Sequence, residues 1–225
     1  ALTNLNLYNC LGITSLVTTP LTALKELNLS YSGVKKFNGV ADTMDFSDNT
    51  KLINLYLNGI TSFTSFDVSA NTSLEEFVLV DNSNVTTLEF TGITTLKTLV
   101  LSDVSTLTSL NIGDCTALES VTLLNTGLTS LSLDGYGKLS KLWVYNNSAL
   151  ATISVNNAPL LTDVKLAAVT TNTALTSLAI TNCTTLTSLD VTYLTALTTL
   201  NVSGCTTLTS LGTIPSTVTD LNVYN

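Results

Sequence analysis

Several residue types that carry chemistry are scarce or absent in this chain. Its 225 residues include no histidine, and only 11% are charged, with 8 Lys+Arg against 16 Asp+Glu and a net charge of −8. Without histidine there is no Ser-His-Asp triad, no histidine-ligated metal and no imidazole base. An acidic chain with a pI near 4.2 also lacks the cationic patch that nucleic acids or anionic lipids require. We therefore expect no nucleic-acid partner, and catalysis is disfavoured.

Long apolar runs are missing too, although 44% of the residues are hydrophobic and the mean hydropathy is +0.41. The longest runs, such as residues 77–80, fall far short of the roughly 20 residues that span a membrane as a helix. We predict no transmembrane segment. The chain opens without a start Met, a charged n-region or an apolar h-region, so we expect any signal peptide to be absent from this sequence.

What the sequence does contain is one motif, repeated along nearly its whole length. The pattern L-x-x-L-x-L, with Ile, Val or Phe as substitutes, starts every 11 residues at Leu52, Phe63, Leu74 and Val85. Two kinds of half-repeat alternate, so the full period is 22 residues. In one kind, such as 63–72 and 107–116, the outward positions carry mostly small polar residues, and we call these half-repeats the uniform row.

The other half-repeats, which we call the variable row, begin ten coils. Their leading residues are Leu2, Leu24, Leu52, Leu74, Leu96, Leu118, Leu139, Leu161, Leu186 and Leu208. Two steps exceed 22 residues, which places insertions near Val34–Val40 and Val169–Asn172. Within x-L-x-L the two leucines share one face of a short strand, and a coil of this size cannot bury them alone. Neighbouring coils must therefore stack in parallel into a mainly β solenoid, which we expect to form a single domain over residues 1–225.

The motif L-x-x-L-x-L-x-x-N/C, present in ten coils, resembles the leucine-rich repeat family. The nested second half-repeat is similar to the short repeats of surface proteins from Bacteroidetes-type bacteria. This resemblance implies a leucine-rich repeat parallel sheet and a non-catalytic binding module, and the chain would be a fragment of a longer secreted or surface protein. A right-handed parallel β-helix is the alternative architecture, because the sequence leaves open whether the second row forms a full sheet.

One column of the repeat holds Asn or Cys and lies eight residues after the leading apolar residue. We expect these side chains to form a structural ladder that hydrogen-bonds the backbone of neighbouring coils. Cys183 and Cys205 lie one period apart, so they would stack about 4.8 Å from each other. In parallel register their side chains point side by side, so we expect free thiols. The sequence leaves open the alternative of a disulfide between Cys183 and Cys205. The ladder comprises Cys10, Asn49, Asn71, Asn82, Cys115, Asn147, Cys183 and Cys205.

We find no pattern that would hold a metal, a cofactor or a catalytic centre. The aspartates do not form D-x-D-x-D-G or G-G-x-G-x-D loops, so we expect no calcium site. Glu75 and Glu76 are adjacent on a strand and point to opposite faces, which makes them a poor acid-base pair. Ice binding is disfavoured because the Thr-Ser pairs are adjacent and do not form a T-x-T array. We therefore expect no enzyme activity.

The outward positions of the variable row are chemically diverse and collect most of the large aromatic and charged residues. We expect register to place Thr122, Trp143 and Lys165 side by side on successive strands. Exposed aromatic and cationic clusters are typical binding hot spots, although simple cross-strand packing would also explain them. We predict that the variable row forms the concave sheet. The sequence leaves open the opposite assignment, in which the variable row lies on the convex side. The predicted ligand-binding face comprises Tyr31, Tyr56, Glu76, Lys141, Trp143, Tyr145, Asp163, Lys165, Asp190 and Tyr193.

The leading functional hypothesis is a monomeric leucine-rich repeat module that recognises a protein or glycan in adhesion at the bacterial cell surface. The alternative is a structural spacer in a larger adhesin, with no ligand of its own. A spacer would not need Lys141, Trp143 and Tyr145 on a solvated face.

Overall fold

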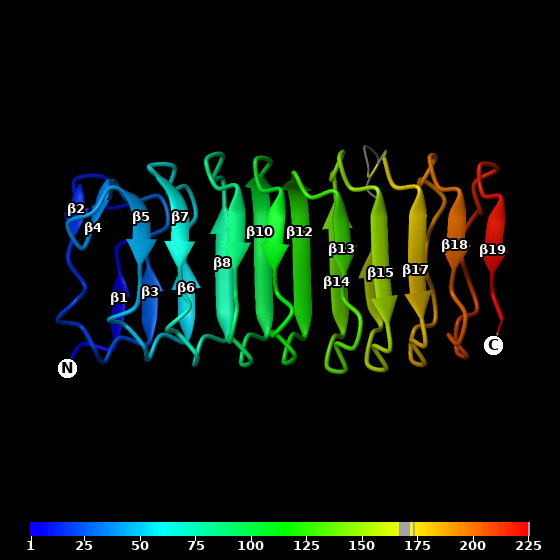
Figure 1. The fold of residues 1–225 in the computed structure, drawn as a ribbon, viewed down its shortest axis with the longest axis horizontal. Helices are drawn as coiled ribbons and strands as arrows, with labels where there is room; N and C mark the ends of the chain where they lie inside the picture. Colours follow the sequence, from blue (N-terminus) through cyan, green and yellow to red (C-terminus); the bar gives the residue numbers. More distant parts are fainter. Residues whose placement is uncertain (167–171, 173, 225) are drawn as a thin grey trace. The chain divides into compact units, whose positions relative to one another are not determined.

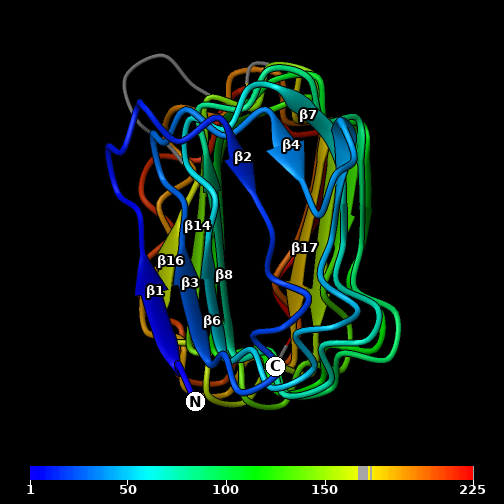
Figure 2. The same cartoon turned by 90° about the vertical axis from the view of Figure 1, so that its left-hand side faces the viewer.

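The computed structural model describes residues 1–166, 172 and 174–224, which form two compact units, Ala1–Cys115 and Thr116–Asn225. In each unit the strands of the two rows form opposite walls and run in opposite directions (Figures 1 and 2). Leucines from both walls meet between them. Each unit is described below by itself.

In Ala1–Cys115 the variable row forms a continuous parallel sheet. Partners lie one coil apart, as in Leu5↔Leu27, Leu27↔Leu55 and Leu55↔Phe77, so apolar residues stack on the inner face. The strands, in spatial order, are β1 (Asn4–Asn6), β3 (Glu26–Asn28), β6 (Asn54–Tyr56), β8 (Glu76–Val80) and β10 (Thr98–Val104).

The uniform row of this unit is interrupted. It consists of three separate parallel pairs: β2 (Ser15–Leu16) with β4 (Lys36–Phe37), β5 (Asp42–Asp45) with β7 (Phe63–Asp67), and β9 (Thr87–Glu89) with β11 (Ser109–Asn111). The Phe46 N–H donates to the Asp67 carbonyl at 3.1 Å on one side of the break, and the Phe90 N–H donates to the Asn111 carbonyl at 2.9 Å on the other. Across the described residues of β7 and β9 the equivalent bond, from Val68 to Glu89, is not formed.

A cavity of about 340 Å³ lies at this break. It is lined by Ser65, Phe66, Asp67, Ser69, Thr87, Glu89 and Thr91.

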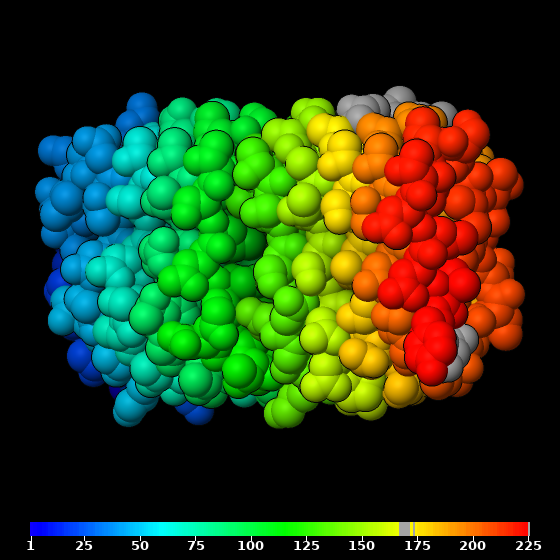
Figure 3. All heavy atoms as spheres, turned by 45° about the vertical axis from the view of Figure 1, so that its right-hand side comes forward, coloured from blue at the N-terminus to red at the C-terminus, as the bar shows by residue number. Residues whose placement is uncertain are grey.

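In Thr116–Asn225 the uniform row is the longer sheet. It pairs β13 (Ser130–Ser132), β15 (Thr152–Asn156), β17 (Ser177–Thr181), β18 (Thr199–Asn201) and β19 (Asp220–Asn222) in parallel, and Figure 3 shows the last of these coils in red beside its orange neighbour. The variable row contains β12 (Ser120–Thr126), β14 (Lys141–Tyr145) and β16 (Asp163–Lys165). Beyond β16, among the residues that the structure describes, it continues as the bridge Ser188↔Ser210.

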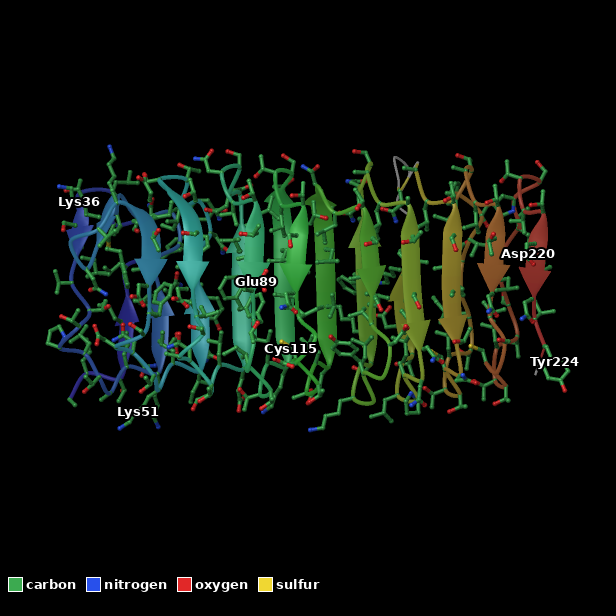
Figure 4. The ribbon with its side chains drawn as sticks, in the orientation of Figure 1. Lys36, Lys51, Glu89, Cys115, Asp220 and Tyr224 are labelled. Carbon is green, nitrogen blue, oxygen red and sulfur yellow. The ribbon has the colours of Figure 1, made fainter. Side chains whose placement is uncertain are left out.

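The core of each unit is built by the repeat leucines and their substitutes, which alternate with outward polar residues along every strand. Leu24, Leu27 and Leu29 are fully buried, as are their equivalents in most coils. The rings of Phe77 and Phe90, one from each wall, pack edge to face with centroids 5.0 Å apart. On the uniform row the outward side chains are mostly short and tipped with oxygen, with Glu89 and Asp220 among them (Figure 4).

These observations confirm the predicted parallel β-solenoid built on the leucine-rich repeat motif. The second row carries true strands that pair in parallel. The first insertion forms a tight turn in which Phe37 and Val40 exchange backbone hydrogen bonds, and the second lies outside the described residues apart from Asn172. No helix in the part of the chain that the structure describes could cross a membrane. The single domain and the concave variable row stay predictions.

One turn position of the variable row has a left-handed backbone in seven of the coils. It lies seven residues after the leading apolar residue, directly before the Asn/Cys column. Gly, Asn and Asp tolerate this conformation, whereas a bulky residue there costs about 1–2 kcal/mol. Tyr31, with φ of 55°, is the one bulky residue among those with a positive φ at this position, which are Asn9, Tyr31, Gly59, Asp81, Asp103, Asn125 and Asn146. Tyr193 and Pro215 occupy the same position of the last two coils without a positive φ.

Candidate functional site

The densest cluster of predicted site residues surrounds Trp143 on β14. Register places Trp143 between Thr122 on β12 and Lys165 on β16, which confirms the expected row of three. The Lys165 ammonium lies 4.1 Å from the centroid of the indole ring, and the ammonium of Lys141, two residues earlier on β14, lies 3.5 Å from it. The indole therefore carries two cation–π contacts, which fix its position on an outward face.

Asp163 completes this cluster from β16. It is the register partner of Lys141, and its Oδ2 accepts a hydrogen bond of 2.9 Å from Nε1 of Trp143. The ring of Tyr145 follows on β14, with its centroid 6.3 Å from that of Trp143. Burial, and secondarily the Asp163 charge, raises the pKa of the Tyr145 phenol, so Tyr145 stays a neutral donor. We call Lys141, Trp143, Tyr145, Asp163 and Lys165 the tryptophan cluster. Its two cations against one anion give it a positive charge within an acidic protein.

The other two predicted residues of this unit lie apart from the strands of the cluster. Asp190 follows the Ser188 bridge, and its Oδ1 accepts a hydrogen bond from the Thr192 N–H at 2.9 Å, as in an Asx turn. Tyr193 is 53% exposed in the next turn.

In Ala1–Cys115 the predicted residues fall on strands of the variable row or on the turn directly after them. The Tyr56 hydroxyl on β6 donates to Oε2 of Glu76 on β8 at 2.6 Å. Burial, together with this bond, raises the pKa of Tyr56 well above its usual value. One coil further, Lys97 and Glu75 form a half-exposed ion pair at 2.8 Å, of the kind that adds little stability.

Tyr31 lies in the turn after β3 and reaches across two coils. Its hydroxyl donates to Oδ2 of Asp81 at 2.8 Å, and the hydrogen bond raises the pKa of the phenol. In the coil between Tyr31 and Asp81, the Tyr31 ring lies against the backbone of Gly59. A Cβ on Gly59 would come within 2.4 Å of Cδ1 of that ring. The ring of Tyr8 meets that of Tyr31 at 86°, with centroids 6.0 Å apart. We call Tyr8, Tyr31 and Asp81 the tyrosine corner.

Two members of this corner were not among the predicted site residues. Tyr8 occupies the same repeat position as Tyr145, six residues after a leading leucine, so this shared position was an available signal. Asp81 shares the left-handed column with Tyr31, but nothing in the sequence shows that the tyrosine reaches it.

The Asn/Cys column lies inside the coils. Asn49, Asn71, Asn82 and Asn147 are fully buried, and each amide donates to backbone carbonyls. Asn71, for example, donates to the carbonyls of Phe46 and Asn49 at 3.1 and 2.8 Å, which ties it to the coil before. Each residue therefore satisfies carbonyls that the turn leaves unpaired.

The cysteines of the column are free thiols, as parallel register predicts. Cys115 and Cys205 are buried and direct their sulfurs to the carbonyls of Phe90 and Ile180, 25 residues earlier, which is the offset that Asn71 and Asn82 also use. Burial raises the pKa of Cys115 to about 12. The hydrogen bond with Cys205, together with burial, raises the pKa of Cys183. Cys10 is only half-buried. Buried thiols with raised pKa values, such as Cys115 and Cys183, are inert packing groups. The hydrogen bond with Cys183 lowers the pKa of Cys205.

Among the described residues, no group of three or more Cys, Asp or Glu side chains is arranged to hold a metal ion. The tryptophan cluster and the tyrosine corner offer cation–π contacts, hydrogen bonds and charged groups.

No protein-family model and no curated protein matches the sequence. Among solved structures, the functional domain of InlJ from Listeria monocytogenes, described as including a cysteine ladder, is similar over 90% of this chain and 56% of its own, with 22% identity and a TM-score of 0.33. An internalin, inlF, from the same species matches over 90% of this chain and 87% of its own, with 18% identity and a TM-score of 0.28.

A leucine-rich repeat protein from Bacteroides ovatus matches over 97% of this chain and 78% of its own, with 14% identity and a TM-score of 0.25. The chain thus spans little more than half of the InlJ domain. All three TM-scores are low, and the parallel β-solenoid follows from the motif and the register of this chain itself.

Proposed function

We propose that the chain is a non-catalytic leucine-rich repeat module that binds a protein partner through the variable row, in adhesion at a bacterial cell surface. The tryptophan cluster carries this proposal. Trp143 is the only tryptophan of the chain, and it lies on an outward face between two lysines. A spacer would need only the short hydroxyl side chains that cover the uniform row.

The chemistry of the cluster suits a partner that presents a carboxylate beside an apolar side chain. The indole is fixed by Lys141, Lys165 and Asp163, so little conformational freedom is lost on binding. Buried Trp residues with cationic neighbours are typical interface hot spots, and truncation of one costs about 2 kcal/mol or more.

The test is to screen the 225-residue chain against bacterial and host protein arrays and a glycan array, and then to measure binding of the best partner to Trp143→Ala. We expect an affinity loss of about 30-fold, the equivalent of 2 kcal/mol at a hot spot. Tyr224→Ala, which truncates an 81% exposed aromatic outside the cluster, is the matched control and should bind normally. Far-UV circular dichroism of each variant checks the fold.

Equal binding by wild type and Trp143→Ala would contradict the site. A chain that binds nothing on the arrays would favour the spacer. A ligand found only on the glycan array would replace the protein partner by a saccharide.

A further inference from the structure

Tyr31 stands out because its left-handed backbone, with φ of 55°, is unfavourable for an aromatic residue. In the other coils where this position has a positive φ it holds Gly, Asn or Asp, which adopt this backbone with little or no strain, whereas Tyr193 occupies the same position without a positive φ. An aromatic residue there stores strain that Asn would avoid, and strain of this kind gathers at functional sites.

Three contacts hold the strained side chain in one orientation. The ring lies against Gly59, the hydroxyl is bonded to Asp81, and Tyr8 packs at a right angle to it. Despite these contacts Tyr31 is still 37% exposed and Tyr8 58% exposed. The strands that support the corner, β3, β6 and β8, are successive in the sheet (Figure 2). The corner is therefore a preorganised aromatic surface open to solvent.

A purely structural role does not account for this arrangement. The Tyr31–Asp81 hydrogen bond is solvent-exposed, and such bonds add little net stability because water competes for both groups. Asn at position 31 would relieve the strain and lose this bond, the Tyr8 contact and the packing of the ring on Gly59.

From this geometry we infer that the tyrosine corner binds the guanidinium of an arginine on the partner protein. The inference rests on the proposed function and names the chemistry that its partner presents. A guanidinium is planar, stacks on aromatic faces and donates in a fork to carboxylates. Tyr31 offers the ring, and Oδ1 of Asp81 has no hydrogen-bond partner among the described residues, so it is available to accept.

The charge of the surroundings has the matching sign. Asp81 and Asp103 both act on the Tyr31 phenol and raise its pKa, which shows a negative potential at the ring. The chain itself contains no arginine, because all eight of its cationic side chains are lysines. It therefore has no guanidinium of its own to occupy the corner.

The test is an NMR titration of the ¹⁵N-labelled chain with N-acetyl-arginine amide. We expect saturable shifts of the Gly59 and Asp81 amides. N-acetyl-citrulline amide, which keeps the planar shape without the charge, and N-acetyl-lysine amide, which keeps the charge without the plane, should each bind about tenfold more weakly. Equal binding of either analogue, or shifts that do not saturate with arginine, would overturn the inference.

Two variants locate the site. Tyr31→Asn installs the residue found at Asn9 and Asn125 of the same column, so we expect unchanged or higher thermal stability together with at least tenfold weaker arginine binding. Asp81→Asn should weaken binding by a similar factor, whereas Tyr193→Ala, an exposed tyrosine elsewhere, should not. Unchanged binding by Tyr31→Asn would refute the site.

The titration needs no macromolecular partner. If it fails while Trp143→Ala still weakens partner binding about 30-fold, the arginine site is wrong and the proposed function stands.

Discussion

Asn147 offers the sharpest energetic test of the ladder, because its side chain is fully buried and each of its two polar atoms, Nδ2 and Oδ1, makes two hydrogen bonds. Its Nδ2 donates to the carbonyls of Leu123 and Tyr145 at 3.0 and 2.8 Å. Its Oδ1 accepts from the N–H and the hydroxyl of Thr126 at 2.9 and 2.5 Å. Asn147→Ala removes all four bonds. At about 1 kcal/mol for each bond, we expect the free energy of unfolding to fall by about 4 kcal/mol.

Asn82 is the matched control. It is equally buried in the same column, and its Nδ2 donates to the carbonyls of Leu57 and Val80 at 3.0 and 2.8 Å. Its Oδ1, however, is buried without a partner. Asn82→Ala therefore loses two bonds but also removes an unsatisfied buried oxygen, so we expect a cost of only about 1 kcal/mol.

Urea unfolding measures both variants. Far-UV circular dichroism follows the whole chain, and fluorescence of the single tryptophan, Trp143, follows Thr116–Asn225. The reasoning is refuted if Asn147→Ala costs no more than Asn82→Ala, because the ladder oxygen would then contribute nothing.

Three further predictions concern single residues. Gly59→Ala places a Cβ 2.4 Å from the Tyr31 ring in a left-handed turn, so we expect about 1–2 kcal/mol of destabilisation in urea unfolding, whereas Gly92→Ala, with open space around it, should show only the cost of the backbone. Cys115, with a pKa raised to about 12 by burial, should resist iodoacetamide at pH 8 until urea unfolds the chain, as mass spectrometry of the labelled peptides would show. The raised pKa of Tyr56 means that above about pH 10 the unfolded chain loses a phenol proton that the folded chain keeps. Stability should therefore fall as pH rises through this range, and less so in Tyr56→Phe; a urea midpoint that rises with pH would contradict the assignment.

The solenoid and its register could be predicted from the sequence because two periods coincide. Alternation within each strand defines the inner leucines, and the 22-residue step brings equivalent positions together on successive strands. The row of Thr122, Trp143 and Lys165 follows from these periods alone.

Other features depend on contacts that no period encodes. The reach of Tyr31 to Asp81 requires a left-handed turn at Tyr31 and a glycine in the coil between, and the 28-residue step to that coil obscures their shared column. The break between β7 and β9 is equally hidden, because the motif is intact at both Phe63 and Val85.

That break gives Ala1–Cys115 an uneven response to force. Between the coils of β7 and β9, only the variable row, through β6 and β8, provides strand-to-strand backbone hydrogen bonds, whereas the neighbouring coils are tied on both walls. Tension along the stacking axis would therefore separate these two coils first, because backbone hydrogen bonds join their strands on one wall instead of two. Under such tension Ala1–Cys115 would lengthen between these two coils while its other coils stay closed.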